Sequence, residues 1–121
     1  IRVIGQTRGC QEVIETAEGG WRMTEINDKI SQEKLTYYLN LTKEARKKAT
    51  PIHEKGTAQD DMLAVLLRMA DDYTSDAQHF MNTGDYIRAY GAINYAHAWI
   101  DAGVKLRLLD GHGDDRLFTL P

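Results

Sequence analysis

Apolar residues recur at helical spacing along three stretches of the chain. In each stretch most successive members are three or four residues apart, which keeps them on one side of a helix. The three stripes are Ile26, Ile30, Leu35, Tyr38, Thr42, Ala45 and Ala49; Met62, Leu66, Met69, Tyr73 and Phe80; and Tyr86, Tyr90, Ile93, His97, Ile100 and Val104. This pattern predicts helices over about 24–49, 58–82 and 85–109.

Helix-breaking and capping residues separate the stretches. Pro51 ends the first because a proline ring cannot take the next helical hydrogen bond. Thr57 is a suitable N-cap for the second, Gly84 a suitable C-terminal cap, and Asp85 opens the third. The sequence therefore predicts an all-α fold, an up-and-down three-helix bundle over residues 23–110, with a short C-terminal tail over 111–121.

Residues 1–22 form a predicted N-terminal extension with weak periodicity and little regular structure. The chain starts with Ile1, and the codons for "GGWRM", residues 19–23, would be rich in guanine just before an ATG. One interpretation is a translated leader that precedes a domain starting near Met23. The other is a short strand, "IRVIG", followed by a helical turn over 11–17. Both interpretations stay open.

Composition limits the classes of function. The chain has 121 residues, enough for one domain, with 15 Lys and Arg against 18 Asp and Glu. A net charge of -3 is unlike the basic footprint of a nucleic-acid binder, so no nucleic acid is expected as a partner. No apolar run is long enough to cross a membrane. Cys10 is the only cysteine, which favours a reducing cytoplasm.

The third predicted helix is apolar around most of its circumference. Beyond its main stripe, Tyr95, Trp99, Ala102 and Leu106 continue the apolar surface. A helix of this kind is covered by another element or by a partner. We therefore expect these four residues to form an interface, with a second copy of the chain or an unidentified protein as partner.

The same helix suggests a second hypothesis, in which Tyr90, His97, Trp99 and Asp101 line a pocket. His97 and Asp101 are four residues apart, so a carboxylate could orient the imidazole for acid-base chemistry. Because His97 lies on the core stripe, a buried structural histidine is favoured. No catalytic residue is assigned, and the two hypotheses are a non-enzymatic interaction module and a small-molecule binder or weak enzyme.

Two acidic sets could in principle bind a metal. Asp72, Asp76 and His79 share one side of the second predicted helix, but the Glu-x-x-His pair of two-metal bundles is missing. Asp110, His112 and Asp114 resemble the opening of a calcium loop that lacks its glycine and final glutamate. The sequence therefore predicts no metal site and no cofactor.

Three stretches together resemble a known family. They are "LTYYLNLTKEARKKATP", "MADDYTSDAQHFMNTGDY" and "GDYIRAYGAINYAHAWIDAGVKL", and Gly84 to Gly103 is the most specific part. Residues 28 to 109 resemble the archaeal family catalogued as domain of unknown function 357. The resemblance implies a small three-helix bundle from an archaeal cytoplasm, with no assigned activity. Residues 1–22 and the tail lie outside it.

Overall fold

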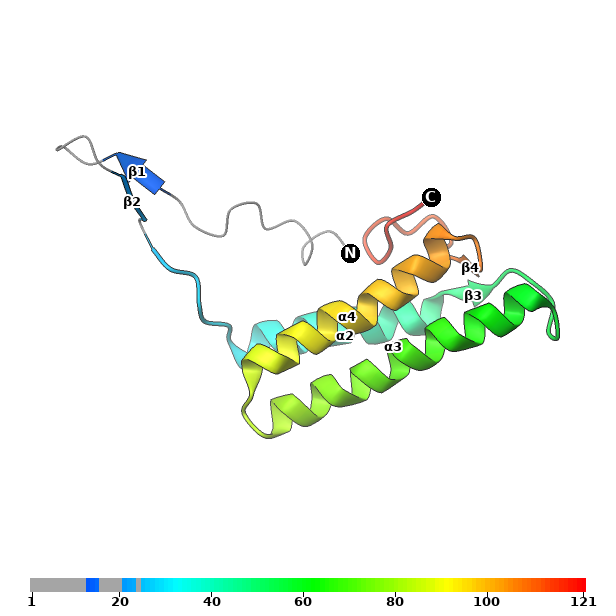
Figure 1. Ribbon diagram of the computed structural model, residues 1–121, viewed down its shortest axis with the longest axis horizontal. Helices are drawn as coiled ribbons and strands as arrows, with labels where there is room; N and C mark the ends of the chain where they lie inside the picture. Colours follow the sequence, from blue (N-terminus) through cyan, green and yellow to red (C-terminus); the bar gives the residue numbers. More distant parts are fainter. Residues whose placement is uncertain (1–12, 16–20, 24) are drawn as a thin grey trace.

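The computed structural model describes residues 13–15, 21–23 and 25–121 (Figure 1). In this part of the chain three α-helices are present: α2 (Gln32–Lys48), α3 (Ala58–Asn82) and α4 (Tyr86–Lys105). Two short antiparallel strand pairs accompany them, β1 (Val13–Glu15) with β2 (Trp21–Met23) and β3 (Thr50–Pro51) with β4 (Leu109–Asp110). The predicted all-α three-helix bundle is confirmed.

Most of the predicted N-terminal extension lies outside the described residues, including the "IRVIG" segment. The described residues Val13–Glu15 form a strand, so the helical turn expected over 11–17 is not found there.

Each helix begins at a side chain that accepts a hydrogen bond from a backbone N–H three residues later. Ser31 accepts from Lys34, Thr57 from Asp60 and Asp85 from Arg88. Helix α2 consequently begins at Gln32, well after the expected start near residue 24. Ile26 continues the apolar periodicity of α2, but it precedes the cap and is exposed.

Both α3 and α4 end in a left-handed residue that turns the chain out of the helix. Gly84 fills this position after α3, with a φ angle of 79°. After α4 the same position is filled by Arg107, with a φ angle of 60°. Leu108 N–H then donates to Gly103 O and Arg107 N–H to Val104 O. Helix α4 therefore ends at Lys105, one turn before the expected end near residue 109.

Helix α4 is the central element of the bundle. It packs against α3 along its length and against α2 on another side (Figure 1). Its buried residues are Ala89, Ala92, Ile93, Ala96, His97, Ile100, Gly103 and Val104. Half of this set is alanine or glycine, so neighbouring helices can approach α4 closely there.

The residues expected to form a short tail are part of the core. Leu117 is 0% exposed and Phe118 is 1% exposed, and both belong to the same buried cluster as Leu35 and Ile100. Phe118 N–H donates to Asp114 O at 3.1 Å, which closes one helical turn. We call residues 111–121 the C-terminal segment, and it packs on the bundle instead of extending from it.

Candidate functional site

Helix α4 carries the candidate residues on two different sides. His97 contacts Thr42 of α2 and Leu117 of the C-terminal segment. Tyr90 lies beside Tyr38 of α2, with ring centroids 6.1 Å apart. Trp99 instead contacts the ring of Tyr95, which contacts α3. The structure therefore brings Tyr90, His97 and Asp101 to one side and places Trp99 on another, so the four predicted pocket residues do not converge.

His97 is buried and uses both ring nitrogens. Its Nε2 lies 2.7 Å from the carbonyl oxygen of Leu117, and its Nδ1 lies 2.9 Å from Thr42 Oγ1. Because a carbonyl oxygen only accepts, Nε2 carries the proton and donates it. Nδ1 then accepts from the Thr42 hydroxyl. This neutral tautomer has a partner at both nitrogens, as a structural histidine in a core requires.

The surroundings of His97 oppose its protonation. Burial lowers the pKa of His97, because a charged imidazolium loses its hydration there. The Asp101 carboxylate, with Oδ1 3.9 Å from Nε2, and the hydrogen bond to Leu117 raise the pKa, but they are the smaller effects. His97 is accordingly neutral at pH 7 in the folded protein.

Three side chains spaced four residues apart on α4 bind the main chain of the C-terminal segment. His97 donates to Leu117 O at 2.7 Å and Lys105 Nζ donates to Leu120 O at 2.8 Å. Between them, Asp101 Oδ1 accepts from the backbone N–H of Thr119 at 3.1 Å. These three contacts hold the main chain of residues 117–120 against α4.

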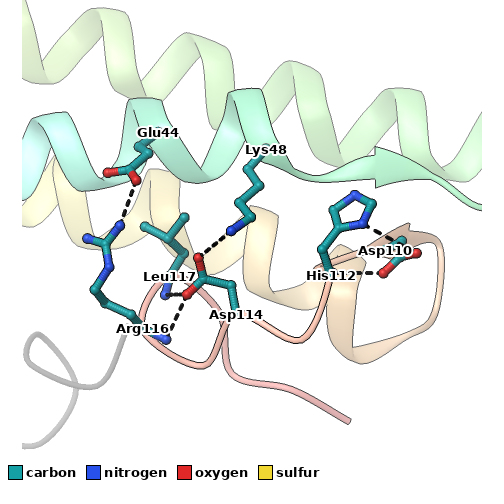
Figure 2. Close-up of polar contacts among 7 residues, drawn as sticks. All are labelled: Glu44, Lys48, Asp110, His112, Asp114, Arg116 and Leu117. Carbon is teal, nitrogen blue, oxygen red and sulfur yellow. Dashed lines mark hydrogen bonds and ion pairs between the residues drawn. The ribbon is translucent and has the colours of Figure 1, made fainter.

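Helix α2 adds two charged contacts to the same segment. Figure 2 shows Lys48 reaching the carboxylate of Asp114, with Nζ 2.7 Å from Oδ2. Arg116 Nη2 donates to Glu44 Oε1 at 2.6 Å. Asp114 also accepts from the N–H groups of Arg116 and Leu117. The hydrogen bond from Lys48 is the main cause of a lowered pKa for Asp114.

We call these six residues of α2 and α4 the C-terminal docking surface: Thr42, Glu44, Lys48, His97, Asp101 and Lys105. The four-residue spacing of His97, Asp101 and Lys105 is visible in the sequence. No sequence feature near these residues indicates that residues 114–120 contact them.

A second surface lies on the side of α4 that faces away from α2. Tyr73 of α3 meets Tyr95 of α4 edge to face, with ring centroids 4.4 Å apart, and Tyr95 meets Trp99 at 5.7 Å. These contacts join a stripe on α3 to a stripe on α4. We call the combined surface the α3/α4 face; its residues are Met62, Val65, Leu66, Met69, Tyr73, Tyr95, Trp99, Ala102 and Leu106.

The α3/α4 face is apolar and open to solvent. Met62 is 53% exposed, Val65 62%, Tyr95 45% and Leu106 66%, while the other five residues are partly buried. The indole N–H of Trp99 is buried and has no hydrogen-bond acceptor among the residues described. All four predicted interface residues of α4 lie on this face. The contribution of α3 went unpredicted, although its stripe has the same spacing.

The acidic sets considered as metal ligands do not gather into a site. In the described part of the chain, no group of three or more His, Cys, Asp and Glu side chains could hold a metal ion. Asp72 lies near Arg68, with Oδ2 4.0 Å from Nε, and Asp110 lies near His112. Among the described helices, none has the length and apolar composition needed to cross a lipid bilayer.

The fold and these two surfaces define a small all-α protein with an apolar face on one side of its central helix and a peptide-holding surface on another. Residues 37–109, more than half of the chain, match the family described as protein of unknown function, DUF357. The chain belongs to this family. Comparison with curated proteins and with solved structures gave no match.

Proposed function

We propose that this protein is a non-enzymatic interaction module that associates with a second copy of itself through the α3/α4 face. The supporting observation is the continuity of that face, in which two helices expose adjoining apolar stripes. Its nine residues carry no formal charge. Monomeric proteins rarely expose large apolar patches, and such patches commonly mark interaction sites.

The size of the face sets the expected affinity. Its residues span 62–73 on α3 and 95–106 on α4, a length of about 17 Å at 1.5 Å per residue. Two adjacent helices, each about 10 Å wide, are together about 20 Å wide, which gives a footprint of roughly 350 Å² per copy. That is below the roughly 800 Å² per partner of a stable interface. We therefore expect a weak, reversible dimer with a dissociation constant on the order of 100 μM.

Sedimentation velocity of freshly isolated monomer between about 10 μM and 1 mM tests the proposal, because two exposed faces associate rapidly. The unmodified chain should shift from monomer to dimer over this range, because dimers of this area form only at high concentration. The double variant Val65→Lys, Leu106→Lys should remain monomeric over the hours of such a run, since a two-fold pairing through the face would bury four ammonium groups. Ile87→Lys, which changes an 85% exposed residue of α4 outside the face, is the matched control and should still dimerise.

Either of two results contradicts the proposal. One is an unmodified chain that stays monomeric up to 1 mM. The other is dimerisation that the Val65→Lys, Leu106→Lys variant leaves unchanged.

The proposal includes an archaeal cytoplasm as the working environment, as the sequence resemblance implies. A chain whose only cysteine is Cys10 has no pair with which to form an internal disulfide, and this suits a reducing compartment.

A further inference from the structure

The C-terminal segment is held in the way a protein holds a separate peptide. Three α4 side chains bind its main chain at Leu117, Thr119 and Leu120. Leu117 and Phe118 supply the apolar anchors, both fully buried. Charged residues of α2 pair with the side chains of Asp114 and Arg116 (Figure 2). Main-chain contacts, apolar anchors and flanking charges are the elements of peptide recognition.

We propose that the C-terminal docking surface also binds the C-terminal segment of a second copy, so that two copies exchange their segments. None of these contacts requires the segment to belong to the same molecule. A second copy offers every group that the docking surface binds, including the acidic and basic partners for Lys48 and Glu44. This association uses the opposite side of α4 from the α3/α4 face, so it goes beyond the proposed function.

The connection between α4 and the segment favours exchange. The chain reverses through a turn in which His112 has a φ angle of 55° and Gly113 a φ angle of 69°. The left-handed region is unfavourable for a residue with a Cβ, even though histidine tolerates it better than most. Short connections under strain promote this kind of exchange, because opening the turn releases the strain.

The effective concentration of the segment and the strain released by opening the turn together set the protein concentration at which exchange should occur. A short connection gives the segment an effective concentration of millimolar order at its own surface. Releasing one left-handed residue is worth about tenfold in the equilibrium constant, and an exchanged dimer releases two. Exchanged dimers should therefore form at protein concentrations on the order of 10 μM. Exchange is slow, because the buried anchors must first leave the core.

The first test changes the length of the turn, in a background that carries Val65→Lys and Leu106→Lys to prevent association through the α3/α4 face. Deleting His112 and Gly113 prevents the segment from folding back on its own bundle. The shortened chain should be a dimer by light scattering at about 50 μM, while inserting Gly-Ser-Gly after Gly113 should give a monomer. A shortened chain that is helical and monomeric would overturn the proposal, as would equal dimerisation of the two length variants.

The second test leaves the length unchanged and guards against a shortened chain that fails to fold. Native mass spectrometry follows the same background chain, mixed from ¹⁵N-labelled and unlabelled protein and incubated between about 10 and 500 μM. Mixed dimers should appear, and His112→Gly should reduce them by about tenfold per chain, because glycine removes the strain from the closed turn. The absence of mixed dimers at 500 μM, or an equal amount with His112→Gly, would contradict exchange. Neither result bears on the α3/α4 face, which is blocked in this background.

Discussion

Phe118→Ala is expected to destabilise the whole bundle, although Phe118 is the fourth residue from the end of the sequence. The ring of Phe118 is 1% exposed and belongs to the central core cluster. Replacing a buried phenylalanine by alanine typically costs about 3 to 5 kcal/mol, from lost burial and the cavity that remains. This is a large part of the roughly 5 to 15 kcal/mol by which a domain of this size is stable.

Urea denaturation followed by helical circular dichroism measures the change. A loss of about 3 kcal/mol corresponds to a fall in melting temperature of roughly 10 to 15 °C for a domain of this size. The control is Thr119→Ala, which alters the exposed neighbouring side chain and should change stability by less than about 0.5 kcal/mol. If Phe118→Ala were no more destabilising than Thr119→Ala, the C-terminal segment would not be part of the core in solution.

Three further predictions concern stability. Burial lowers the pKa of His97 in the folded protein below its value of 6.5 in the unfolded chain. The stability that neutral His97 contributes is therefore fully present above pH 6.5 and is lost as the pH falls towards the folded pKa. Urea denaturation should therefore show lower stability at pH 5.5 than at pH 7.5, and His97→Gln should reduce this difference. The lowered pKa of Asp114 means that its carboxylate stabilises the fold above pH 3.8 and that this stability is lost on further acidification. Asp114→Asn should therefore make the loss of stability at acidic pH smaller. Gly103→Ala should cost about 1 to 2 kcal/mol, because its Cβ would lie 2.8 Å from Leu109 Cδ1. Gly91→Ala, with no heavy atom within 4 Å of the added Cβ, should instead stabilise α4 by about 0.5 to 1 kcal/mol, and equal effects of the two glycine changes in thermal melts would contradict the packing described.

Local capping signals predicted both ends of α3. Helix α3 runs from Ala58 to Asn82, as expected, because Thr57 and Gly84 act through hydrogen bonds within a few residues of themselves. The start of α2 was missed because apolar periodicity continues through Ile26, whereas the Ser31 side chain caps the N-terminus and makes the helix begin at Gln32. The end of α4 was missed because Arg107 takes a conformation that usually indicates glycine.

The two surfaces differ in how far the sequence predicts them. Helical geometry places Tyr95, Trp99 and Leu106 on one side of α4, because each residue turns the helix by a fixed angle. The same geometry places His97 on the core stripe. It contains no information on which element covers that stripe, and here the covering residue is Leu117, twenty positions along the chain. Contacts made after a chain reversal depend on tertiary packing, which periodicity does not record.

The central claim, association through the α3/α4 face, is tested most directly by the methionine methyl signals in a ¹³C NMR dilution series. Met62 and Met69 lie on the face, while Met81, also on α3, lies outside it. Between about 1 mM and 20 μM the methyl signals of Met62 and Met69 should shift together along one binding curve, with Met81 unchanged. Methyl signals that do not depend on concentration, or shifts confined to Met81, would contradict the claim.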